Sequence, residues 1–135
     1  MGARKATLLV MAKMALSDGV VAEEERSFLE PLLQGDETVD KLLAEAKDKK
    51  LEELVGTIEN YADRFFIALR AASMASIDAD LDAREEALYE KLVAVLEIPQ
   101  DDQAVIKRSV AALDAIEAPP PEPRVEQLYR ESSFA

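Results

Sequence analysis

Hydrophobic residues recur along most of this chain at the i, i+3, i+4, i+7 spacing of one helix face. This spacing predicts a first helix over residues 4–17, and further helices over 23–33, 36–50, 51–58, 61–77, 82–97 and about 101–116. Turn signals separate these segments at Ser17-Asp18-Gly19, Gln34-Gly35-Asp36 and Ile98-Pro99, and Pro31 is expected to bend or shorten the second helix. The expected fold is all-α, a single-domain bundle of about seven helices.

The expected helical domain covers residues 1–117. The stretch "APPPEPR", which starts at Ala118, cannot continue a helix and marks the end of this domain. Residues 118–135 are therefore expected to form a Pro-rich linker and a flexible C-terminal tail. Val125, Leu128 and Tyr129 could form one amphipathic turn in this tail, but so short a segment is marginal as an isolated helix. An alternative is a docking peptide at 124–135 that folds on a partner.

The amino-acid composition excludes several kinds of functional site. Hydrophobic residues make up 49% of the chain and aromatic residues 5%, and the abundance of Ala and Leu suits a helical bundle. The formal charge of −12 leaves no basic footprint for nucleic acid. The chain has no Cys and no His, so thiolate chemistry, Ser-His-Asp triads and His-ligated zinc are excluded, and we expect no enzyme. A metal site would use carboxylates, carbonyls and water, which suit Ca²⁺, Mg²⁺ or Mn²⁺.

The N-terminal stretch "MGARKATLLVMAKMALS" has the basic start and apolar run of a signal peptide. Lys13 interrupts that run and the helical periodicity continues beyond it, so we interpret the stretch as the first helix. No segment approaches the roughly 20 apolar residues of a transmembrane helix. An acidic surface would also repel anionic lipids, so contact with membranes is expected only through partners. The absence of a clear export signal favours the cytoplasm.

The stretch between the first two predicted helices recurs sixty residues later. "MALSDGVVAEEE" at 14–25 and "MASIDADLDAREE" at 74–86 share the pattern D-x-x-[VL]-x-x-x-E, which aligns Asp18 with Asp78 and Glu25 with Glu85. At the same offset, apolar positions also align: Phe28, Leu29, Leu32 and Leu33 meet Leu88, Tyr89, Leu92 and Val93. Because polar and core positions both match, we predict a duplicated helix–loop–helix unit. Two such units would pack around a pseudo-two-fold axis with their loops near each other.

The repeated phrase D-G-x-[IV]-x-x-x-E resembles the TerB-like family, which includes tellurite-resistance TerB proteins and the N-terminal domain of DjlA-type co-chaperones. The stretch "LEIPQDD" is similar to the family's entry into its closing helix, and the resemblance covers residues 4–117. It implies an all-helical bundle, a role in stress responses, and divalent metal held by Asp18, Glu25, Asp78 and Glu85. The chain departs from the family pattern at Ala22 and Ala79, and it shows no J-domain.

The loop carboxylates have two interpretations. In the first they are structural: Asp82 and Glu85 have the spacing of a capping box, and Asp18 and Asp78 can close turns at helix ends. In the second, Asp78, Asp80, Asp82 and Glu85 converge on a hard cation. The second loop is not an EF-hand, because that motif needs Gly and Glu at the positions of Ala83 and Tyr89.

The sequence therefore predicts a non-catalytic TerB-like module that binds a divalent cation through its acidic loops, a protein partner, or both. The alternative is an interaction scaffold, an adaptor whose loop carboxylates only cap helices and which docks through a helix face or the C-terminal tail.

Overall fold

The computed structural model describes residues 2–17, 23–76, 83–112 and 122–133. Within these ranges the regular structure is entirely helical. The elements are α1 (Ala3–Leu16), α2 (Glu23–Leu29), the 3-10 turn η1 (Glu30–Leu32), α3 (Val39–Asp48), α4 (Leu51–Val55), α5 (Tyr61–Ser76), α6 (Ala83–Leu96), α7 (Gln100–Ala112) and α8 (Pro123–Glu131). The first seven α-helices correspond to the seven predicted from the apolar pattern, which confirms the all-α class.

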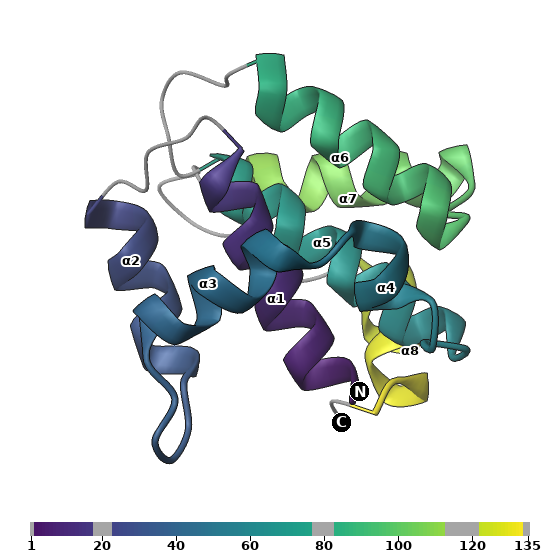
Figure 1. The fold of residues 1–135 in the computed structure, drawn as a ribbon. Helices are drawn as coiled ribbons and strands as arrows, with labels where there is room; N and C mark the ends of the chain where they lie inside the picture. Colours follow the sequence, from purple (N-terminus) through teal and green to yellow (C-terminus); the bar gives the residue numbers. More distant parts are fainter. Residues whose placement is uncertain (1, 18–22, 77–82, 113–121, 134–135) are drawn as a thin grey trace.

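Two helices, α1 and α5, form the centre of the molecule (Figure 1). They pack against each other; α3 lies on α1, α6 and α7 lie on α5, and α4 contacts both α1 and α6. The apolar pattern predicts a face of α1 made of Leu8, Leu9, Met11, Ala12, Ala15 and Leu16. Burial extends beyond this predicted face to Thr7, Val10 and Met14, so that nearly all sides of α1 are covered. A helix surrounded in this way must be apolar around its whole circumference, and most of α1 is. On α5 the core side chains include Phe65, Ile67 and Met74.

The helix ends follow the turn signals in the sequence. Pro31 lies in η1, directly after α2 ends at Leu29, because proline cannot donate the next helical hydrogen bond. Gly35 adopts a φ of 61°, which glycine tolerates at low cost. Helix α6 ends with Glu97 in the left-handed region (φ 58°), and the Ile98 amide donates to the Val93 carbonyl at 3.1 Å, as in a Schellman cap.

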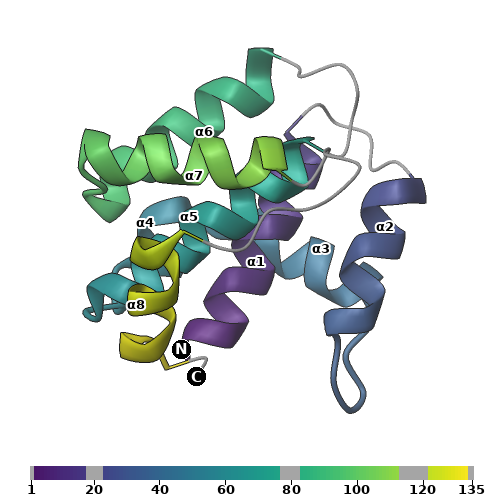
Figure 2. The ribbon, with the colours of Figure 1, turned by 180° about the vertical axis from the view of Figure 1, so that it is seen from behind.

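The C-terminal segment differs from the expected flexible tail. Residues 123–131 form α8, which packs on the outside of α5 (Figure 2). Pro123 occupies the first helical turn, where its missing amide hydrogen costs nothing. Leu128 is 1% exposed and belongs to the main hydrophobic core. The tail prediction is wrong for these residues, because tertiary contacts stabilise a helix that would be marginal alone.

None of the helices in the described ranges is long and apolar enough to cross a membrane.

Candidate functional site

The predicted acidic site falls mainly outside the described residues. Asp18, Asp78, Asp80 and Asp82 lie outside the described ranges, as does the side chain of Glu85, whose backbone is the third residue of α6. Glu25 is described and is the third residue of α2. Among the described residues, no three carboxylates come together as a metal ligand set. Cation binding at these loops therefore stays a prediction.

The helix bounds preserve the sixty-residue offset of the repeat. Helix α1 ends at Leu16 and α5 at Ser76, while α2 begins at Glu23 and α6 at Ala83. The connections at 17–22 and 77–82 therefore have equal length. The C-terminal ends of α1 and α5 lie side by side, and α2 and α6 begin toward that same end of the molecule (Figure 1 and Figure 2).

One carboxylate of the repeat is part of the interior. Glu25 is 1% exposed and has at least one interaction partner within the fold. It stands in the first turn of α2, where the partial positive charge of the helix end stabilises a carboxylate. Its burial agrees with the structural interpretation of this position, and an ion in the first loop would have to reach a side chain that the fold encloses.

A buried carboxylate joins α7 to α8. Asp102, in the first turn of α7, accepts hydrogen bonds from Arg124 of α8, at 3.1 Å from Nε to Oδ1 and 3.0 Å from Nη2 to Oδ2. The Tyr61 hydroxyl at the start of α5 donates to the same carboxylate. The Arg124 guanidinium, and then Tyr61, hold the pKa of Asp102 below its ordinary value. Burial, followed by the Asp102 hydrogen bond, raises the pKa of Tyr61.

A second polar contact holds the far end of α8. The Asn60 side chain caps α5 by accepting from the Ala62 amide at 2.8 Å, and its Nδ2 donates to the Glu131 carbonyl at 3.0 Å. Asp63, only 6% exposed, accepts from the Ser133 amide at 2.7 Å and from the Ser133 hydroxyl at 2.9 Å. The N-terminal turn of α5 thus recognises the C-terminal end of α8.

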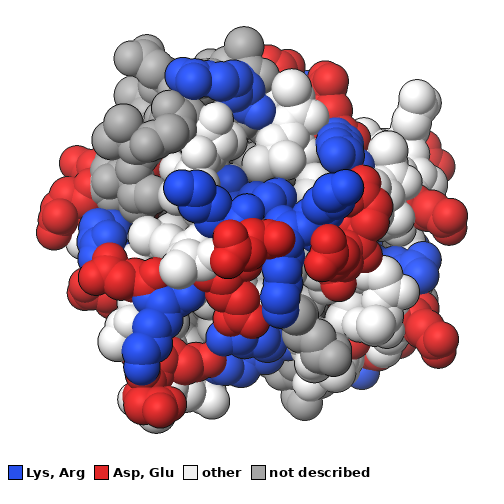
Figure 3. All heavy atoms as spheres, viewed as in Figure 1, with Lys and Arg blue, Asp and Glu red and all other residues white. Residues whose placement is uncertain are grey.

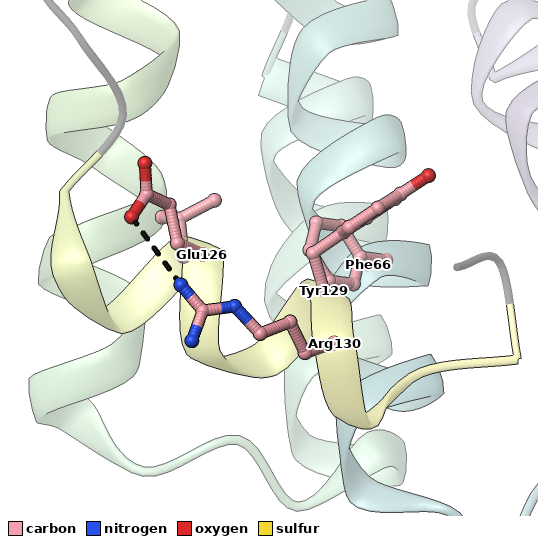
Figure 4. Close-up of a pocket in the computed structure, with 5 residues that line it drawn as sticks. Phe66, Glu126, Tyr129 and Arg130 are labelled. Carbon is pink, nitrogen blue, oxygen red and sulfur yellow. Dashed lines mark ion pairs between the residues drawn. The ribbon is translucent and has the colours of Figure 1, made fainter.

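An apolar hollow of about 440 Å³ lies where α8 meets α5 (Figure 4). Tyr129 of α8 packs edge-on against Phe66 of α5, with 5.9 Å between ring centroids. Tyr129 is 49% exposed, the largest exposure of any large hydrophobic side chain in the described ranges. Glu126 and Arg130 lie together on one side of the aromatic pair and form a 3.9 Å ion pair (Figure 4). The lining residues are Phe66, Val125, Glu126, Tyr129 and Arg130.

A second hollow, of about 540 Å³, carries basic side chains. Figure 3, viewed as in Figure 1, shows Lys and Arg side chains near the centre of the molecule, with acidic side chains directly below them. Lys13 donates to the Ala46 carbonyl at 3.2 Å and the Lys49 carbonyl at 2.6 Å, so it closes the C-terminal end of α3. Lys91 lies 3.6 Å from Glu52. Lys13 therefore has a structural role, whereas the Lys91–Glu52 ion pair is more than half exposed on both sides. The lining residues are Lys13, Lys50, Leu51, Glu52, Leu88 and Lys91.

The chain matches no protein-family model, and comparisons with curated proteins and with solved structures gave no significant match. The TerB-like resemblance therefore rests on the repeated acidic motif and the entry into the closing helix. Sequence reasoning missed the attachment of α8. Its one visible signal was the spacing of Val125, Leu128 and Tyr129, which marks an apolar helix face.

Proposed function

We propose that this chain is a non-catalytic, TerB-like binding module of a cytoplasmic stress response, which takes a divalent cation at its two acidic inter-helix loops. The observation that carries the proposal is the duplicated motif, D-x-x-[VL]-x-x-x-E, at an offset of sixty residues. The equal connection lengths, and the gathering of the flanking helix ends toward one end of the molecule, support it.

In this proposal the cation acts on the arrangement of helices. Asp78, Asp80 and Glu85 would repel one another without a counter-ion, since like charges at close range are unfavourable. An occupied site neutralises that repulsion and fixes the α1–α2 hairpin relative to the α5–α6 hairpin. The bound and free forms would then present different surfaces to a protein partner. Oxygen ligands make Ca²⁺, Mg²⁺ or Mn²⁺ the expected ion.

The test is a thermal melt after chelation, repeated with each cation on the wild type and on Asp78→Asn/Asp80→Asn. At a hundredfold excess over its dissociation constant, a cation that binds only the folded state adds about 2.7 kcal/mol to the free energy of unfolding. The matched control is Asp36→Asn/Asp48→Asn, which removes the same charge at two exposed positions. The control and the wild type should shift at micromolar cation, and the loop variant should not.

The second candidate is the adaptor scaffold, which the burial of Glu25 favours. A carboxylate enclosed at the start of α2 is stabilised by the helix end and by its partner within the fold, as a structural role requires. If wild type and loop variant both fail to respond up to millimolar cation, the repeat consists of caps and the adaptor role takes its place.

A further inference from the structure

Helix α8 is held on the surface of α5 and α7 by contacts that resemble the recognition of a peptide ligand. The receiving side chains, Asn60, Asp63, Phe66 and Asp102, all belong to α5, α7 or the residue that caps α5, and Tyr61 supports them by donating to Asp102. These helices also pack on other parts of the bundle, α5 on α1 and α6 and α7 on α5. The receiving surface is therefore positioned by the rest of the fold and not by α8.

The contacts that α8 makes define a short pattern. Arg124 pairs with Asp102, Leu128 lies one turn later and is buried, and Ser133 binds Asp63 beyond the end of the helix. The two receiving carboxylates, Asp102 and Asp63, are each less than a tenth exposed. Asp102 accepts from the Arg124 guanidinium at the start of α8, and Asp63 accepts from the Ser133 amide and hydroxyl beyond its end. An amphipathic helix laid in a groove is a recurring mode of peptide recognition.

Helix α8 buries few of its side chains on the surface that it covers. One side chain of α8, Leu128, is fully buried, whereas Val125 is half-buried and Tyr129 about half-exposed. The helix has nine residues, and helices this short do not persist without their packing partner. The hollow between Phe66 and α8, lined on the α8 side by Val125, Glu126, Tyr129 and Arg130, stays unfilled. A helix with a larger apolar side chain at the position of Val125 would bury more of this surface.

We propose that the α5–α7 surface is a recognition groove for an amphipathic helix of a partner protein with the pattern Arg-x-x-x-Leu, and that this helix replaces α8, the resident occupant. Charge complementarity selects the occupant, because Asp102 requires a cation and a segment without arginine would leave the carboxylate buried without its ion pair. The proposal is independent of cation binding at the acidic loops.

The probe is a fluorescein-labelled peptide with the sequence of residues 122–133, measured by anisotropy against full-length protein. The variant Arg124→Ala/Leu128→Ala weakens the resident helix and leaves the groove residues intact. We expect this variant to bind the peptide at least tenfold more tightly than the wild type does, because α8 no longer competes. Adding Asp102→Asn to that variant should reduce the affinity at least tenfold, and adding Asp101→Asn, at the exposed neighbouring position, should not. A peptide with leucine in place of Val125 should bind more tightly still.

The proposal would be overturned if wild type and weakened variant bound the peptide equally, or if Asp102→Asn did not reduce the affinity. If the weakened variant fails to fold, hydrogen exchange on the wild type decides the question. Local release of α8 requires its amides to exchange at least tenfold faster than those of α5. If the amides of both helices exchange at the rate of global unfolding, α8 is an integral part of the core and the groove proposal is refuted.

Discussion

Replacing Asp102 with asparagine removes the charge that anchors α8 and leaves the size of the side chain almost unchanged. The side chain of Asp102 is 7% exposed and that of Arg124 is 40% exposed. Breaking a fully buried ion pair by removing one partner costs about 3–5 kcal/mol. Because water can rehydrate Arg124, the loss should be nearer to that of a hydrogen bond to a charged group, about 1.5–3 kcal/mol.

We therefore expect Asp102→Asn to lower the free energy of unfolding by about 2 kcal/mol at pH 7. For a chain of this length, that corresponds to a fall in Tm of about 6–10 °C. Urea denaturation of wild type and variant measures the difference directly. Asp101→Asn is the matched control, because Asp101 is the exposed neighbour on the same turn of α7 and should change stability by less than about 0.5 kcal/mol.

The lowered pKa of Asp102 also predicts how the stability of the fold depends on pH. The pKa of Asp102 in the folded protein lies below the ordinary 3.8, so the unfolded chain binds the proton more readily. Its stabilising contribution is therefore complete above about pH 5 and is lost as the pH falls below 3.8 toward the folded pKa. The difference in the free energy of unfolding between wild type and Asp102→Asn should be constant from pH 7 to 5 and should become smaller below pH 4.

A double-mutant cycle with Arg124→Met isolates the pair. The coupling energy should be at least about 1 kcal/mol, since residues in direct contact are not additive. A loss below 0.5 kcal/mol for Asp102→Asn at pH 7, or a gap that stays constant down to pH 3, would refute the account of this ion pair.

Three further predictions test other parts of the fold. Leu9→Ala should lower the free energy of unfolding by about 2–5 kcal/mol in urea denaturation, because Leu9 is fully buried in α1 and the cavity cannot close. The pKa of Glu37 is about 2, chiefly because Arg4 donates to it; NMR titration should show this value rising toward 4.5 in Arg4→Ala, and an unchanged value would exclude the pair as the cause. Gly35→Ala should cost about 1 kcal/mol because of its positive φ, whereas Gly2→Ala, at a φ of −75°, meets no such strain and should cost less; thermal melts of the two variants measure the difference.

Helix positions could be predicted because the chain marks them locally. The predicted breaks at Ser17, Pro31 and Pro99 each fall within two residues of an observed helix end, and Gly35 lies in the connection between η1 and α3, since proline and turn residues act through their own backbone. What the apolar pattern could not reveal is that α1 is enclosed on nearly all sides. Its buried Thr7 lies off the predicted face, and the burial depends on the helices that surround α1.

Helix α8 could not be predicted for a related reason. Its stability depends on Asp102, which lies 22 positions before Arg124, and on Asp63, 70 positions before Ser133. Contacts between residues so far apart leave no periodic pattern in the sequence. The acidic loops show the opposite situation, because their repeat is visible in the sequence while most of their side chains lie outside the described residues.

The described part of the chain shows what carboxylates do when this fold encloses them. Glu25, Asp63 and Asp102 are each less than a tenth exposed, and each has partners within the fold. Asp63 and Asp102 both attach α8 to the bundle, so two of these buried carboxylates hold one helix against another. If the loops at 17–22 and 77–82 serve the same end through a shared cation, the melt of Asp78→Asn/Asp80→Asn will reveal it. The peptide experiment addresses the groove alone, so either function can fail without deciding the other.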